Sequence, residues 1–566
     1  MRFPFAKLLA AALMGVLAAA QSATLPEVVE RTLPNGFRIL LVERPGTGAA
    51  HLRLFIQGGR ANAGGLPPAA ADLLARTLFR RTLPEEVARA LAPLLAQEDG
   101  SFEALRLERL RLVRQPAGTA SLETQPLQAM HDRTLASILD KVGPLETWDA
   151  LDALGASHRE IVVGADFLAH GADVPASAVA VWSQIEAGRF RRLPMGRFPL
   201  EREALVRELD GGKPPCPPSL SALLGTALAG HPYASAADFQ RSGVEALSLE
   251  DMETYAHWRV VPEHATLVVV GDVRAATVLP VLEKAFGALG RGTLGAIHHE
   301  ELPGYRNADA AGSLETPGGR HLTVGTSGDT RIFFAWRVPP ANHPDGPALR
   351  ALAQVLGGSP SSRLNQNLGG PRGVARNLTV QMGVPGEKDG NLLVIEAEPA
   401  EGRSLGELEL AIQTEILRVQ REPVPDAEVR RAQAQMEAAQ ILIQEDAGVL
   451  AEALGAAQCQ GGDWRLAFRA LVAGRDLKAG AIQAAARSYL GPARLTVAQF
   501  GPDPLLQPLD RTETRMLQVL TALVQRKLGD EAQSQVVLRE ALRQLRMLSP
   551  AEREQTLRLL EAQVKP

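Results

Sequence analysis

The side chains of this sequence that could do chemistry are few and widely separated. Residues 298–301 (His-His-Glu-Glu) place two imidazoles beside two carboxylates, which are ligand types that zinc prefers. Adjacent residues point in different directions on any regular backbone, so this segment is a weak candidate for a metal site. His131, His158 and His170 stand alone in the sequence, and we interpret them as ordinary structural histidines.

Other catalytic patterns are absent from the sequence. No Ser/His/Asp spacing, nucleophile elbow or phosphate-binding glycine loop stands out, and Gly369-Gly370 is typical of a turn. The two cysteines, Cys216 and Cys459, are too few for a disulfide framework, and we expect them to be thiols.

The composition indicates an ordinary globular protein without a strong charge. The chain has 566 residues, of which 60 are basic and 64 acidic, so its formal net charge is −4. Hydrophobic residues make up 45% of it. This even balance argues against nucleic acid or an anionic membrane as a partner, and no basic cluster is interleaved with aromatic residues. The length is sufficient for two or three domains.

The first residues predict export. Arg2 and Lys7 precede an apolar run over residues 8–20, which ends in a small-x-small pattern. We therefore expect residues 1–20 to be a signal peptide and the mature protein to be periplasmic or otherwise exported. The run is short for a bilayer span, although an uncleaved anchor is the alternative. No second long apolar run follows, so no integral membrane segment is expected after signal removal.

The rest of the chain predicts two α+β units and a helical tail. Residues 24–295 form the first unit, 296–312 a linker, 313–505 the second unit and 506–566 a helical extension. In the first unit, hydrophobic periodicity predicts strands at 37–42, 51–57 and 265–271 and helices at 67–78, 200–209 and 249–257.

The ends of the two units resemble each other. Tyr255 precedes the apolar strand 265–271, and Tyr489 precedes a similar strand before Gly501. A helix, a tyrosine, a strand and a glycine in the same order indicate an internal duplication. In the tail, the apolar face that includes Met516 and Val519 needs a partner, either the body of the chain or another protein.

Several short segments, in one shared order, resemble the pitrilysin/insulinase family of zinc peptidases. They are Thr32–Ile39, Thr77–Thr82, Leu154–Ala156, His231–Tyr233, Leu249–Val273, Leu356–Gly358 and Ser361–Leu364. The resemblance covers about 24–505, with 83–145 as an insertion. It implies an α+β protein of two related domains, each with a mixed or antiparallel sheet and helices packed on one face, followed by the helical tail.

The same resemblance places the family's catalytic positions. An active member carries H-x-x-E-H on one helix, where the two His hold zinc and the Glu is the general base. Aligned on Thr77, these positions are Asp72, Leu73, Leu74, Ala75 and Arg76. Arg76 has no lone pair to offer a metal and Ala75 cannot accept a proton. Asp72 and Arg76 could pair with each other or point into solvent.

The remaining positions of the family's site have also changed. Glu201 and Glu208 fit the family's two Glu seven residues apart, which makes Glu208 the vestigial third ligand and Arg76 its hypothetical ion-pair partner; a solvated helix face is the alternative. The Arg and Tyr that stabilise the family's oxyanion map to Gly369 and Arg376. We therefore expect no catalytic residue, no substrate-binding residue and no zinc.

Three functions follow as hypotheses. The first is a non-catalytic protein that binds a peptide or acts as a pseudo-subunit of an active pitrilysin-like peptidase, in a homo- or hetero-oligomer. The alternative is a zinc metallopeptidase with substituted ligands or a shared heteromeric active site. The third is an interaction module built on the helical tail.

Overall fold

The computed structural model describes residues 25–79, 85–113, 124–143, 149–291, 319–326, 330–502, 511–528, 541 and 550–564. The expected signal peptide, the linker 296–312 and the segment 298–301 lie outside these residues. The described residues pack as two compact units. The first unit contains the described residues up to Gly211, from Arg241 to 291, and from Ala434 to Arg475. The second unit contains the described residues from Gly212 to Gln240, from 319 to Gln433, and from Asp476 onward.

The first unit contains a six-stranded mixed sheet. Its strands, in spatial order, are β1 (Val29–Thr32), β2 (Arg38–Glu43), β6 (Ala265–Gly271), β3 (Ala49–Gln57), β5 (Phe167–Pro175) and β4 (Ser157–Val163). Only the pair β2 and β6 is parallel. Strand β4 therefore lies at one edge of the sheet.

The second unit contains a five-stranded mixed sheet. Its strands, in spatial order, are β7 (Arg320–Thr326), β11 (Leu495–Pro502), β8 (Arg331–Val338), β10 (Asn391–Pro399) and β9 (Ala375–Val384). Only the pair β7 and β11 is parallel.

The two sheets share one topology. Without β1, the first sheet has the spatial order β2-β6-β3-β5-β4 and the second has β7-β11-β8-β10-β9. When the five strands of each sheet are numbered along the chain, both orders become 1-5-2-4-3. The parallel pair joins the first and fifth strands in both. This order confirms the internal duplication, and the predicted α+β class with two related mixed-sheet domains is confirmed with it.

Local signals explain the elements around β6. The strand is buried along its whole length, as its run of valines predicts. The preceding helix α10 (Leu249–Arg259) begins at Ser248, whose hydroxyl accepts from the backbone N–H of Asp251 while the Asp251 carboxylate accepts from Ser248. This capping box confirms the predicted helix start.

Helices α2 (Ala69–Phe79) and α6 (Val179–Arg191) cover one face of the first sheet. His170 of β5 marks this face: its ring stacks on Phe79 of α2 at 4.8 Å, and its Nε2 lies 3.4 Å from Glu186 of α6. All three side chains are buried. Helices α7 (Phe198–Asp210) and α11 (Ala275–Gly287) pack against α2 and α6 respectively.

The opposite face of the first sheet is covered by α16 (Ala447–Gly461). Leu450 and Leu454 of this helix share a buried cluster with Phe55 of β3 and with Val268 and Val270 of β6. Successive residues of a strand face opposite sides, so these residues point away from the face that carries His170. The sequence did not predict this second layer, because α16 comes from far along the chain.

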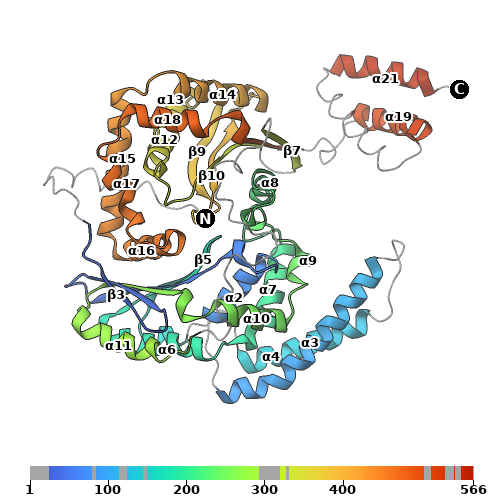
Figure 1. Cartoon of the computed structure of the whole chain (residues 1–566). Coiled ribbons are helices and arrows are strands. Elements are labelled where there is room, and N and C mark those ends of the chain that lie inside the picture. The colour runs from blue at the N-terminus through green and yellow to red at the C-terminus, as the bar shows by residue number, and fades with distance from the viewer. Residues whose placement is uncertain are drawn as a thin grey trace. The chain divides into compact units, whose positions relative to one another are not determined.

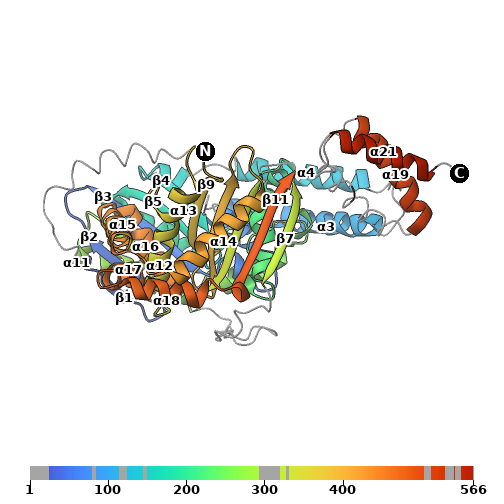
Figure 2. The same ribbon diagram turned by 90° about the horizontal axis from the view of Figure 1, so that it is seen from above.

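The region 83–145 contains a helical hairpin. Helices α3 (Glu85–Val113) and α4 (Thr124–Val142) lie side by side and extend from the rest of the first unit (Figures 1 and 2). At its base, Leu91, Ile138 and Val142 form a small buried cluster with Leu200 of α7. The predicted helical character of this region is confirmed.

The remaining helices complete the two units and the tail. They are α5 (Asp149–Asp152), α8 (Pro218–Ala227), α9 (Arg241–Val244), α12 (Gly346–Gly357), α13 (Arg363–Leu368), α14 (Leu405–Arg421), α15 (Asp426–Glu445), α17 (Leu466–Gly474), α18 (Ala479–Tyr489), α19 (Arg511–Leu528) and α21 (Pro550–Val564). In the tail, α19 packs with α21, and Met516 of α19 is fully buried.

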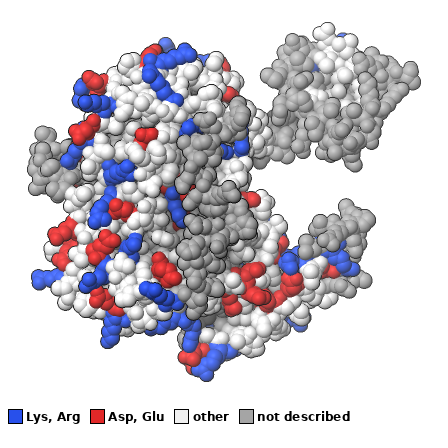
Figure 3. Space-filling model, viewed as in Figure 1, with Lys and Arg blue, Asp and Glu red and all other residues white. Residues whose placement is uncertain are grey.

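Surface and composition features agree with the sequence. Acidic and basic side chains are interspersed over most of the face shown in Figure 3. Cys216 and Cys459 are both buried thiols, as expected. Within the described part of the chain, no helix combines the length and apolar character needed to cross a membrane.

Candidate functional site

The candidate site is built on helix α2. Pro67 and Pro68 precede its first turn, where their missing N–H groups cost nothing. Every residue of the helix is buried except Arg76, which is half-buried. Arg76 is therefore the one residue of the helix that is not fully buried.

Asp72 forms an ion pair with Arg60. Its two carboxylate oxygens lie 2.8 Å from the Nε and Nη2 atoms of Arg60, and its side chain is only 6% exposed. Because Asp72 is in the first turn of α2, the positive end of the helix dipole stabilises the carboxylate further. Of the two sequence-based alternatives for Asp72, pairing with Arg76 or pointing to solvent, neither is observed.

Arg76 binds Glu208, as the sequence analysis hypothesised. Its Nη1 and Nη2 groups each donate to one carboxylate oxygen of Glu208 on α7, both at 2.8 Å. Burial lowers the pKa of the Arg76 guanidinium, but the hydrogen bonds and charge of Glu208 outweigh burial and hold that pKa above its ordinary value. The Arg76 guanidinium is therefore charged at any physiological pH, and its two hydrogen bonds to Glu208 link α2 to α7.

These residues do not fit a zinc ion. Glu208, the one carboxylate left from the family's ligand set, has both oxygens engaged by a cation. Ala75, which the family resemblance assigns to the position of the general base, is fully buried and has no group that can take a proton. Glu201 lies two helical turns before Glu208 on α7. It is also buried, and its carboxylate lies 4.0 Å from the guanidinium of Arg197. No hydrolytic step can be assigned to this arrangement.

The second unit holds the other two family positions. Gly369 ends α13, and a Cβ added there would lie only 2.5 Å from the carbonyl oxygen of Asn365, so the backbone leaves no room for a side chain. Arg376 lies on β9, is 59% exposed and pairs with Glu398 of the neighbouring strand β10 at 3.2 Å. Neither position offers the paired donors that would stabilise an oxyanion.

The isolated histidines have structural surroundings, with one exception. His131 is buried within 3.6 Å of Glu98 and Glu203, and His170 contacts Glu186. His158 is different, because it is largely exposed and lies near two carboxylates. Arg60 and Glu452 were missed by sequence reasoning, since no local pattern links either residue to the groups it meets in the fold.

Comparison with known proteins supports the family resemblance. Residues 246–436 match the family model described as the peptidase M16 inactive domain. No curated protein sequence matches the chain. A protease from Helicobacter pylori superposes with a TM-score of 0.65 at 18% identity, covering 84% of this chain and 100% of that one.

Two further solved structures share the fold. A peptidase M16 inactive domain from Pseudomonas fluorescens has a TM-score of 0.57 at 15% identity, covering 86% of this chain and all of that one. A mutant of the ferredoxin protease FusC, in complex with Arabidopsis ferredoxin, has a TM-score of 0.54 at 14% identity, covering 86% of this chain and 49% of that one. At these identities the structures show a common fold.

Proposed function

Because this chain is a degenerate member of the pitrilysin/insulinase (M16) family, we propose that it is an exported, non-catalytic protein that binds an extended peptide or partners an active peptidase of the same family. The observation that carries the proposal is the Arg76–Glu208 ion pair. The guanidinium of Arg76 binds both oxygens of the Glu208 carboxylate, which zinc would need as a ligand. Arg76 itself takes the position of the second zinc-binding histidine.

The replaced positions of the second unit support the same proposal. A shared active site could be completed by a partner chain if this chain supplied either the metal or the oxyanion-binding pair. It supplies neither, since Gly369 has no side chain and Arg376 is paired across the strand with Glu398. A binding role requires neither group.

The sheet edges offer a way to bind a peptide. Strand β4 ends the first sheet, and an extended peptide can add to such an edge through main-chain hydrogen bonds. Val162 of this strand is 40% exposed. One protein of the same fold is a protease that holds another protein, ferredoxin. Binding through backbone groups would not depend on the residues lost from α2.

The test combines cleavage and binding measurements on the full chain. We expect no cleavage of a fluorogenic peptide library, with or without added Zn²⁺, and measurable binding of extended peptides by fluorescence anisotropy. N-methylation of alternate amides in a bound peptide should abolish binding, because it removes the donors for strand addition.

One result would overturn the proposal. Chelator-sensitive cleavage that disappears in the Glu208→Gln variant would show a working metal centre on α2 and α7. Binding that is unaffected by N-methylation would remove the strand-addition mode and leave the pseudo-subunit role, which co-purification with an active family member would test.

A further inference from the structure

A second group of charged residues lies on the opposite face of the first sheet, under α16. Arg53 of β3 and Glu160 of β4 are both cross-strand neighbours of Gly171 in β5, so their side chains meet over it. A Cβ at Gly171 would lie 2.5 Å from Cδ of Arg53 and 3.0 Å from Oε1 of Glu160. The glycine is therefore what lets the two side chains approach.

Arg53 is the buried centre of this group. Its side chain is 1% exposed, its Nη1 lies 2.9 Å from Asp173, and its Nε lies 2.9 Å from Glu160 and 3.5 Å from Glu452 of α16. Its Nη2 has no hydrogen-bond acceptor within the described part of the chain. This atom lies beside Gly448, one helical turn before Glu452.

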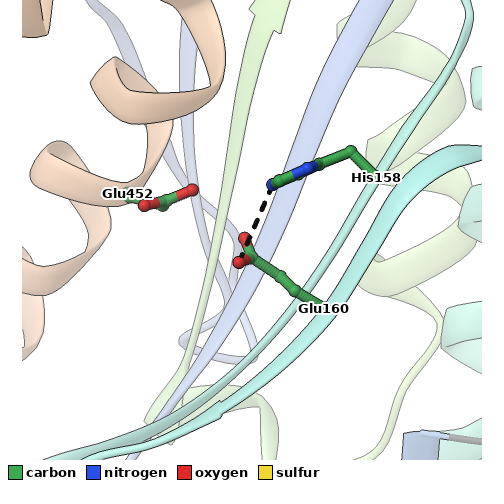
Figure 4. A group of neighbouring side chains, drawn as sticks. All are labelled: His158, Glu160 and Glu452. Carbon is green, nitrogen blue, oxygen red and sulfur yellow. Dashed lines mark ion pairs between the residues drawn. The ribbon is translucent and has the colours of Figure 1, made fainter. Parts of the chain in front are cut away.

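Three ligand-type side chains converge beside Arg53. One ligand atom each from His158, Glu160 and Glu452 lies within 4.8 Å of the other two (Figure 4). Glu160 uses Oε1 toward Arg53 and Oε2 toward His158, whose Nε2 is 3.9 Å away. The strand register shifts between Ser157 and Glu160, and such a bulge can re-aim the side chain that it carries.

The charges of this group do not balance. The carboxylates of Asp173, Glu160 and Glu452 surround the guanidinium of Arg53, and the imidazole of His51 also contacts Asp173 at 3.0 Å. Carboxylates therefore outnumber the guanidinium groups three to one. Two carboxylates this close repel each other unless a proton or a cation lies between them.

We propose that His158, Glu160 and Glu452 together bind one divalent transition-metal ion such as Zn²⁺. The ion would lie between β4 and α16. One imidazole and two carboxylates are suitable ligands for such an ion. Water would complete the coordination. The site is structural: it fastens α16 to the edge of the sheet.

Titration of the full chain with ZnCl₂ after chelator treatment, followed by calorimetry, tests the site. We expect one equivalent to bind, and the His158→Ala and Glu452→Gln variants to bind at least about tenfold more weakly. Both side chains are substantially exposed, so the fold should survive, which circular dichroism checks. The matched control is Glu253→Gln, an exposed residue of α10 that should bind as the parent does.

A further variant separates this site from the vestigial one. Glu208→Gln should leave Zn²⁺ binding unchanged if the ion binds under α16. Binding that survives in His158→Ala and Glu452→Gln, or its absence in the parent chain, would overturn the inference. Loss of binding in Glu208→Gln alone would overturn it and would also contradict the proposed function. Cleavage activity that accompanies intact binding would contradict the proposed function alone.

Discussion

Arg76 and Glu208 join α2 to α7 through two parallel hydrogen bonds of 2.8 Å, at the positions that the family resemblance assigns to zinc ligands. The side chains are 18% and 41% exposed, so solvent screens part of their attraction. The geometry is nevertheless the bidentate one in which arginine binds carboxylates best. The ion pair can join the two helices as a bound metal ion would, but it cannot activate water for peptide hydrolysis.

The strength of this link can be measured by a double-mutant cycle. We expect a coupling free energy of about 0.5–1 kcal/mol between Arg76→Met and Glu208→Gln, since partly exposed pairs contribute amounts of this order. Urea denaturation of the parent, the two single variants and the double variant gives the four free energies of unfolding. A coupling indistinguishable from zero would mean that the pair does not hold the helices together.

Rebuilding the zinc motif should restore metal binding without restoring catalysis. In the variant Asp72→His, Ala75→Glu, Arg76→His, two imidazoles would lie one turn apart on α2, facing Glu208. Arg60→Gln is added because Arg60 would otherwise lose the carboxylate that it binds.

We expect this variant to bind one more equivalent of Zn²⁺ than the parent, by metal analysis, and to cleave no peptide, because Gly369 and Arg376 cannot stabilise an oxyanion. Adding Glu208→Gln should remove the extra equivalent. If the rebuilt variant binds no additional zinc, the alignment of residues 72–76 with the family motif is wrong.

The buried group of His170, Glu186 and Arg189 should make stability depend on pH. Burial raises the pKa of the Glu186 carboxyl, but Arg189 and His170 outweigh burial and hold the pKa below the ordinary value of 4.5. The stabilisation from ionised Glu186 is therefore fully present above pH 4.5 and is lost as pH falls through the lower folded-state pKa.

The variant Glu186→Gln removes this carboxylate and should lower the free energy of unfolding at neutral pH by about 3 kcal/mol, because Arg189 keeps its charge in a buried place. Thermal unfolding followed from neutral to acidic pH should show a shallower decline for the variant than for the parent. Equal slopes would mean that Glu186 does not titrate below its ordinary range.

The packing of α16 on the first sheet can be tested at Gly455. A Cβ at this position would lie 2.0 Å from the ring of Phe55, so Gly455→Ala should destabilise the protein by about 1–3 kcal/mol despite the better helix propensity of alanine.

The matched control is Gly100→Ala in helix α3, where an added Cβ meets nothing within 4 Å. This substitution should stabilise by up to about 1 kcal/mol. A neutral or stabilising Gly455→Ala would show that α16 does not lie against Phe55 in solution.

The sequence predicted what depends on local patterns. The strand β6 and the helix α10 lie where hydrophobic periodicity predicted a strand at 265–271 and a helix at 249–257. The Arg76–Glu208 pair followed from the family resemblance, which placed two distant helices side by side.

Contacts decided by long-range packing could not be read from the sequence. Asp72 binds Arg60 because the chain turns back between β3 and α2. The glycines and prolines of residues 58–68 indicate a turn, but they do not show which side chains it brings together. Glu452 meets His158 and Glu160 because α16 packs on the first sheet, a placement that depends on the shapes of apolar side chains such as Phe55 and Leu454.

The distant origin of α16 has a consequence for biosynthesis. The strands of the first sheet are all complete by Gly271, yet the helix that covers Phe55, Val268 and Val270 begins only at Ala447. During translation, a nascent chain that ends between Gly271 and Ala447 would expose the apolar face of the sheet to solvent. A chaperone that shields this face until residue 461 has emerged would therefore be needed longer than for a domain whose core is contiguous in sequence.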